Sequence, residues 1–142
     1  MIDALGAPFR RYLADHRSCV LIPTGTQGPG PLLVRYHARG LDIHCLLPLW
    51  ADLAHCLQLD PRVSLIIPAP ETADCWLEIR GTASIVSTPD WSTLSIGDTG
   101  RVPPEDLYCV VRIHASRLDL HDGRRGWGAR DTLELASGAG EE

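Results

Sequence analysis

The chain has 142 residues, a size typical of one domain and sufficient to bury a core without disulfides or metals. Its composition is 44% hydrophobic and 22% charged, and no apolar run approaches the roughly 20 residues that a membrane span needs. The net charge is −5 and all 13 basic residues are arginine, which argues against a nucleic-acid partner. The N-terminus lacks the basic-then-apolar order of a signal peptide, so we expect a cytoplasmic protein without a membrane partner.

The first part of the chain predicts short elements separated by turns. Apolar residues at helical spacing open the chain, and Arg39-Gly40 joins two alternating runs into a hairpin. The glycine- and proline-rich turn over 24–31 lacks the residue order of a phosphate-binding loop. Pro48 is expected to begin a short helix, because proline is favoured at the first helical position. The expected elements are a helix over 2–15, strands over 18–23, 32–38 and 41–47, and a helix over 48–59.

Residues 61–87 carry the clearest pattern, two runs that alternate with a period of two. Between them, residues 68–74 contain two prolines and cannot continue a ladder, so the runs predict an antiparallel hairpin with a long loop. Gly81 and Ala83 are small where their neighbours are large, which suggests that a bulky group packs over them. The residues expected to face the core are Val63, Leu65, Ile67, Leu77, Ile79 and Ile85.

The last third is irregular over 88–105 and then returns to strand alternation. We expect strands over 106–114, 117–121 and 132–135, with a glycine-rich turn over 122–128. Strands dominate and the alternation of strand and helix is missing. The fold class is therefore mainly β, a six- to seven-stranded antiparallel barrel with one or two short helices. We expect one domain over 1–136 and a disordered tail over 137–142.

Two segments indicate a narrower group of proteins than this fold class. They are Asp60-Pro61-Arg62-Val63-Ser64-Leu65 and Arg80-Gly81-Thr82-Ala83. With the order of elements around them, they resemble the pyridoxamine 5′-phosphate oxidase-like, FMN-binding split-barrel family, over roughly residues 5–135. The resemblance implies a split β-barrel that forms a homodimer, with flavin bound in the subunit interface. It also implies a flavoprotein that acts as an oxidoreductase on a small molecule, whose identity stays open.

The resemblance also implies where the flavin lies. In this family an arginine on the second strand holds the phosphate, further contacts come from the short helix, and a late tryptophan and arginine approach the ring. The cofactor-binding candidates are Arg35, Tyr36, His37, Trp50, His55, Arg80, Trp127 and Arg130. No catalytic acid or base stands out. Asp52 lies in the expected first turn of the short helix and would compete with a phosphate, so a non-catalytic binding protein that has lost its flavin grip is the alternative.

Other ligands are weaker alternatives. A haem-binding relative would need an axial histidine, and His114 or His121 could serve; deazaflavin F420 is a further possibility. The pairs His44-Cys45 and His55-Cys56 look like metal ligands, but adjacent residues on a strand face opposite sides, so we expect no metal site. The five cysteines show no CxxC spacing and are expected to be buried free thiols.

Overall fold

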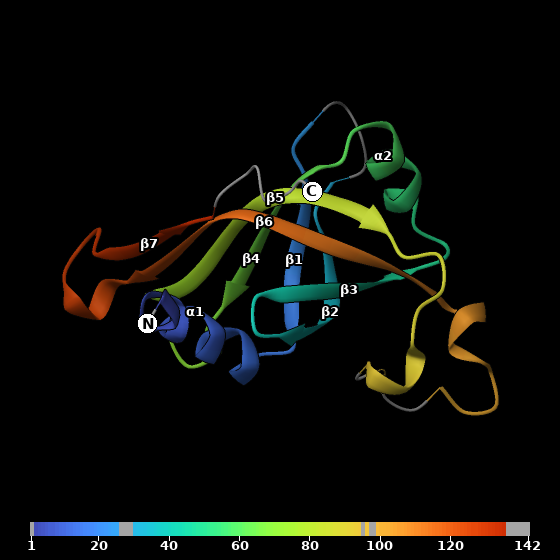
Figure 1. Cartoon of the computed structure of the whole chain (residues 1–142), viewed down its shortest axis with the longest axis horizontal. Coiled ribbons are helices and arrows are strands. Elements are labelled where there is room, and N and C mark those ends of the chain that lie inside the picture. The colour runs from blue at the N-terminus through green and yellow to red at the C-terminus, as the bar shows by residue number, and fades with distance from the viewer. Residues whose placement is uncertain (1, 26–29, 95, 97–98, 136–142) are drawn as a thin grey trace.

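The computed structural model describes residues 2–25, 30–94, 96 and 99–135 (Figure 1). The expected tail over 137–142 and part of the turn over 24–31 lie outside these residues. Within them, seven antiparallel strands form one sheet in the order β3-β2-β1-β4-β5-β6-β7, and a further pairing of β3 with β6 closes six strands into a barrel. Strand β7 lies outside the closure. The strands are β1 (Ser18–Pro23), β2 (Leu32–Arg39), β3 (Asp42–Pro48), β4 (Arg62–Pro68), β5 (Cys75–Ile85), β6 (Tyr108–Asp122) and β7 (Arg130–Glu134).

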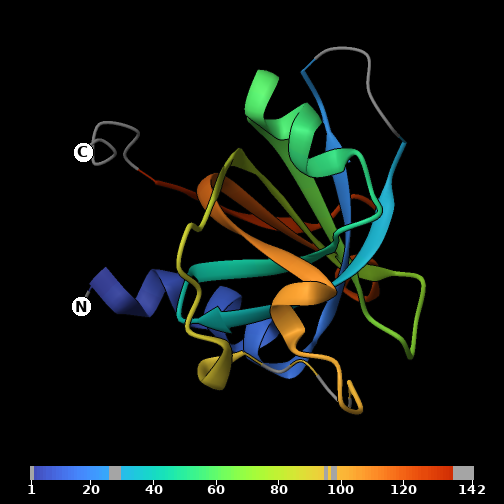
Figure 2. The same cartoon turned by 90° about the vertical axis from the view of Figure 1, so that its right-hand side faces the viewer.

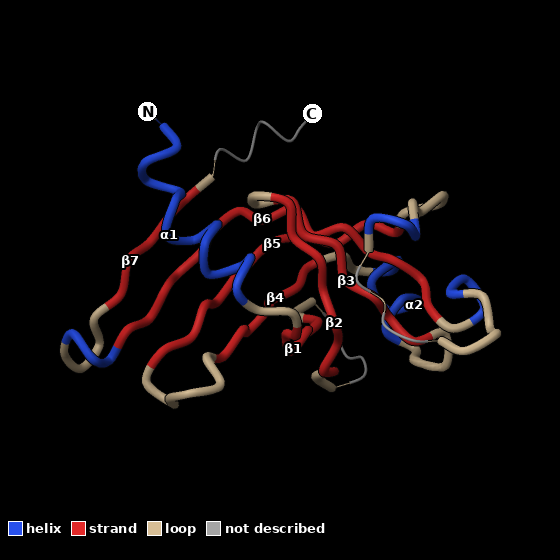
Figure 3. Tube along the Cα trace, turned by 90° about the horizontal axis from the view of Figure 1, so that it is seen from below, coloured by secondary structure: helices blue, strands red, loops and turns tan. Residues whose placement is uncertain are grey.

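The two α-helices of the described residues, α1 (Ile2–Asp15) and α2 (Leu53–Leu59), lie at different ends of the barrel (Figures 1 and 2). Seen from below in Figure 3, α1 lies across the strands, and α2 lies on the opposite side of the molecule from β7. Helix α1 buries Phe9 and Leu13, and the Tyr12 hydroxyl donates a hydrogen bond of 2.7 Å to the carbonyl of Ile67 in β4. The mainly β, antiparallel barrel class with short helices is therefore confirmed. No helix in the described segments is long and apolar enough to cross a membrane.

The core is built from the faces that the alternation predicts. Val63, Leu65 and Ile67 of β4 face inward, and so do Leu77 and Ile79 of β5. In register, Leu65 lies opposite Ile79, which lies opposite Leu118 of β6, so the core residues meet across three strands. Ile85, at the end of β5, is in contrast 38% exposed. All five cysteines lie in described residues and are free thiols, three buried and two half-buried.

Most boundaries agree with the prediction within about two residues, and the two larger differences have the same cause. Helix α2 begins at Leu53 rather than Pro48, because β3 continues to Pro48, where it pairs with Tyr108 of β6. The runs over 106–114 and 117–121 are one strand, β6, whose register shifts where the Ser116 hydroxyl donates to the carbonyl of Arg80. In both places, pairing with a strand distant in the sequence sets the boundary.

The register shift between β5 and β6 explains why residue 81 is a glycine. A Cβ atom on Gly81 would clash with the main chain of β6, at the carbonyl of His114. The residue is small because a neighbouring backbone approaches it closely, rather than because a bulky side chain covers it as the sequence suggested. Its place beside the register shift shows that the bulge and the close approach of β5 and β6 belong together.

Gly81→Ala is therefore expected to lower the free energy of unfolding by about 1–3 kcal/mol, since two paired backbones must separate to admit a methyl group. Chemical denaturation measures this. The matched control is Gly30→Ala, because Gly30 is exposed and a Cβ atom there meets nothing within 4 Å. The control should stay within about 1 kcal/mol of the wild type. Equal stability of the two variants would contradict the close approach.

Candidate functional site

The outer face of β2 carries two of the predicted residues. Arg35 is exposed, and one terminal nitrogen of its guanidinium donates a hydrogen bond of 3.2 Å to the carbonyl of Ile96. His37 lies opposite His44 of β3, and both line a cavity of about 240 Å³ beneath residues 86–94. This is smaller than the roughly 300–1,000 Å³ of most ligand pockets. The cavity alone does not accommodate a flavin.

Tyr36 points the other way. Its ring is buried in the core, and its hydroxyl donates a hydrogen bond of 2.7 Å to the carbonyl of Leu13 in α1. Burial raises the pKa of this hydroxyl far above its usual value, and nearby Cys19 adds to the effect. Tyr36 therefore anchors α1 to the barrel, on the opposite side of β2 from Arg35.

A second group of predicted residues surrounds α2. Trp50, in the connection between β3 and α2, is 77% exposed, and His55 is an exposed residue of α2. Asp52 is the residue before the helix, and its side chain caps no backbone N–H group in the described residues. The helix has only seven residues. This region offers an exposed aromatic ring beside a carboxylate, with no serine or threonine hydroxyl between residues 50 and 55.

A third group lies at the far end of the sheet. Trp127 is fully exposed in the connection between β6 and β7, between Gly126 and Gly128, which have φ angles of 132° and 82°. Left-handed values of this kind favour glycine and let the chain turn tightly around the indole. Arg130 begins β7 and is exposed. Figure 1 shows this connection at the opposite end of the molecule from α2, so a single copy of the chain does not bring these two regions, and the tryptophans in them, together.

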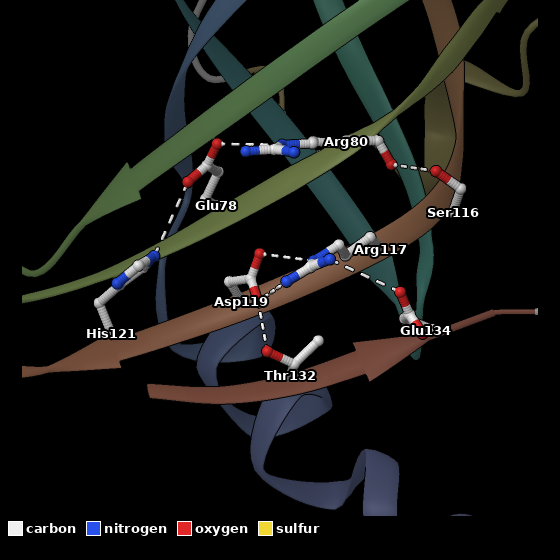
Figure 4. Close-up of polar contacts among 8 residues, drawn as sticks. All are labelled: Glu78, Arg80, Ser116, Arg117, Asp119, His121, Thr132 and Glu134. Atoms are coloured by element: carbon white, nitrogen blue, oxygen red, sulfur yellow. Dashed lines mark hydrogen bonds and ion pairs between the residues drawn. The ribbon is translucent and has the colours of Figure 1, made fainter. Parts of the chain in front are cut away.

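Sequence reasoning missed a polar cluster on the outer face of β5, β6 and β7 (Figure 4). At its centre Asp119 is only 2% exposed, accepts a short hydrogen bond from the Thr132 hydroxyl, and lies 3.0 Å from Nε of Arg117. Burial alone would raise the pKa of Asp119, but the Thr132 hydrogen bond and Arg117 outweigh it and hold this pKa below its usual value. The signal in the sequence was the spacing of Arg117, Asp119 and His121 at every second position of one strand.

The two histidines considered for haem both contact neighbouring side chains. His121 stacks on Trp76 with ring centroids 4.4 Å apart, and its Nε2 atom is buried, 3.7 Å from a carboxylate oxygen of Glu78. Nε2 of His114 lies 2.9 Å from the hydroxyl of Ser84. The His44 side chain is half-buried outside the barrel whereas Cys45 is in the core, and in the described residues no three His, Cys, Asp or Glu side chains are placed to hold a metal ion.

Arg80 lies apart from the other candidates. It is exposed on β5 and lines a hollow of about 1230 Å³ over the outer face of β4, β5 and β6, which we name the β4–β6 groove. This volume is large enough for a small-molecule ligand. Apart from Tyr36 in the core, the predicted residues thus occupy the face of β2, the region of α2, the β6–β7 end and the β4–β6 groove, and none of three cavities lined by described residues collects them.

The protein belongs to the split-barrel class of folds. Its six-stranded barrel is closed, one further strand lies outside it, and the N-terminal helix covers it. No family model and no curated protein matches the chain. A Clostridium acetobutylicum protein related to general stress protein 26, of the pyridoxinephosphate oxidase family, is similar with a TM-score of 0.71 and 10% identity, over 94% of this chain and 96% of that one. General stress protein 26 from Bacillus anthracis has a TM-score of 0.68 and 14% identity, over 94% and 98%.

A heme binding protein from Mycobacterium smegmatis is similar as well. Its TM-score is 0.63 and its identity 15%, and the match covers 92% of this chain and 57% of that one. The chain therefore has the split-barrel fold of the pyridoxamine 5′-phosphate oxidase-like structures, as the sequence resemblance predicted. A heme binding protein and general stress proteins share this fold, so the function has to be argued from the residues.

Proposed function

We propose that the protein binds FMN as a homodimer in the cytoplasm and acts as an oxidoreductase on a small molecule. The observation that carries the proposal is the exposure of two tryptophans, Trp50 and Trp127, at opposite ends of a split barrel. Tryptophan is enriched at protein–protein interfaces, where its large ring buries a wide apolar area. A second subunit would supply the surface that one copy lacks, so that residues of the two subunits together enclose the cofactor.

The residues fit FMN as parts of such a composite site. Arg35 offers a charged donor to the phosphate, because a single nitrogen of its guanidinium is engaged by the described residues. Either exposed indole offers a flat apolar face to the ring, and Arg130 offers a second cation at the β6–β7 end. When bound, FMN supplies hydride or electron transfer, and the side chains provide position and charge.

The second candidate is a non-catalytic split-barrel binding protein. The observation that favours it is Asp52, which precedes α2 in a stretch without hydroxyl groups, so that Arg35 would hold the phosphate with little help. The absorbance spectrum of the purified protein separates the candidates. Flavin bands support FMN, whereas haem or deazaflavin bands assign another cofactor. A colourless protein that also fails to bind added cofactor supports the non-catalytic candidate.

FMN titration followed by flavin fluorescence tests the phosphate contact. Arg35→Ala is expected to weaken FMN binding about ten- to a hundredfold, because one charge-assisted hydrogen bond contributes roughly 1.5–3 kcal/mol. Asp52→Ser should strengthen it about two- to fivefold by removing a like charge. Riboflavin, which lacks the phosphate, should respond little to either change. The control is Arg11→Ala, which removes an exposed arginine of α1. If Arg35→Ala and Arg11→Ala behave alike, Arg35 does not hold the phosphate.

Sedimentation velocity at micromolar concentration tests the homodimer independently of flavin. The outer faces of β1, β2 and β4 present Val20, Leu33 and Ile66 in neighbouring register positions, and Leu33 is 70% exposed. Leu33→Glu is expected to shift the dimer toward monomer, because it places a charge in an apolar contact. A wild-type protein that sediments only as a monomer would overturn the composite site.

A further inference from the structure

The β4–β6 groove is built by cross-strand pairs. Thr82 of β5 lies between Arg62 of β4 and His114 of β6, and the next outward position pairs Ser64 with Arg80. Basic and hydroxyl side chains therefore alternate across the groove. Arg112 of β6 adds a third guanidinium at the side bounded by the β2–β3 turn. These side chains donate hydrogen bonds, and the carboxylates of Asp42 and Glu78 line the same groove.

Two of the guanidinium groups keep free donors. Arg80 contacts Glu78 through Nε at 3.4 Å, and Arg112 contacts Asp42 through Nε at 2.8 Å. In both, the two terminal nitrogens have no partner among the described residues. Arg62 is different, because both Nε and one terminal nitrogen bind the Asp60 carboxylate. Arg80 and Arg112 are therefore the groups available to a ligand.

A ligand can displace the carboxylates that pair with Arg80 and Arg112. The side chains of Arg80 and Arg112 are 60% and 49% exposed, and exposed ion pairs of this kind contribute about 0–1 kcal/mol. A phosphate presents several charged oxygens to the planar fork of arginine and can form two parallel hydrogen bonds with it. Apolar residues complete the groove, with half-buried Leu41 and Leu135 among its lining residues. They would contact the uncharged part of the same ligand.

We propose that the β4–β6 groove is a binding site, separate from the flavin site, for a small molecule that carries a phosphate or diphosphate group. The phosphate oxygens accept hydrogen bonds from the terminal nitrogens of Arg80 and Arg112, with the hydroxyls of Ser64 and Thr82 beside them. The proposal does not depend on FMN binding: Arg80, one of the cofactor-binding candidates, lies in the groove, and the proposed FMN site uses Arg35, Trp50, Trp127 and Arg130 instead.

Inorganic pyrophosphate is the probe, titrated by isothermal calorimetry at low ionic strength. The double variant Arg80→Gln and Arg112→Gln is expected to bind it at least about tenfold more weakly than the wild type. The matched control is Arg124→Gln with Arg125→Gln, which removes two exposed arginines that also pair with carboxylates, at Asp122 and Asp131. The control should bind within about twofold of the wild type. Asp42→Asn is expected to tighten binding, since it releases Arg112.

Three results would overturn the proposal. The first is a wild type that does not bind pyrophosphate at millimolar concentration. The second is an equal weakening of pyrophosphate binding in the two double variants, which would mean that any exposed arginine attracts pyrophosphate by its charge alone. The third is displacement of pyrophosphate by FMN, which would make the groove part of the flavin site. If the protein binds no flavin but the groove variants behave as expected, only the proposed function fails.

Discussion

Replacing Asp119 with alanine is expected to lower the free energy of unfolding by about 3 kcal/mol, the lower end of the range for breaking a buried charge pair. The carboxylate is 2% exposed and accepts hydrogen bonds from Thr132 and Arg117. Without it, Arg117 keeps only Glu134, at 3.6 Å, as an acidic partner among the described residues. The loss stays at the lower end because the Arg117 side chain is 32% exposed and water can reach it.

The pH dependence follows from the lowered pKa of Asp119. The hydrogen bond from Thr132 and the charge of Arg117 stabilise the ionised carboxylate in the folded protein, against the effect of burial. This contribution is fully present above the unfolded pKa of about 3.9 and is lost as the pH falls through the lower, folded value. The stability difference between wild type and Asp119→Asn should therefore be constant near neutral pH and shrink below about pH 4.

Urea denaturation at several pH values measures both effects. The control is Asp131→Asn on β7, whose carboxylate is 55% exposed and lies 3.4 Å from Arg125. An exposed pair contributes about 0–1 kcal/mol, so the control should change stability little. If the two variants lose equal stability, the Asp119 cluster has no special contribution to the fold.

Leu65→Ala is expected to cost about 2–5 kcal/mol, because Leu65 is completely buried between Leu21 of β1 and Ile79 of β5 and its truncation leaves a cavity. The control uses the same substitution at Leu59, the last residue of α2, which is 74% exposed. Leu59→Ala should stay within about 0.5 kcal/mol of the wild type. A cavity cost at Leu59, or none at Leu65, would show that the inward face of β4 is assigned wrongly.

The parts of the fold that the sequence predicts are those in which one strand face is buried and the other is solvated. Leu77 and Ile79 alternate with half-buried and exposed residues on β5, and this local pattern sets both the strand and its orientation. The local pattern of residues could not predict where α2 begins. Pro48 has a favourable local preference for a helix, but pairing with Tyr108, sixty residues further on, holds it in β3.

The candidate site is less accessible to sequence reasoning, because closure of the barrel decides which residues meet. Arg35 and Arg80 are both exposed arginines on strands, yet one contacts the segment at Ile96 and the other lines the β4–β6 groove. The alternating sequence pattern alone predicts that Asp119 is solvated. Only the register of β7, which places Thr132 opposite it, reveals that it is buried.

Strand β7 is the edge strand of the sheet, and its sequence affects whether other chains can pair with it. In the described residues it pairs with β6 alone, so its other backbone edge is open, whereas closure of the barrel leaves the remaining strands with neighbours on both sides. An open edge can template pairing with another chain and start aggregation. Three of its five residues, Arg130, Asp131 and Glu134, are charged and exposed, so an incoming strand would have to desolvate them. This short, charged edge therefore disfavours fibril-like growth from the side of the sheet that the described strands leave open.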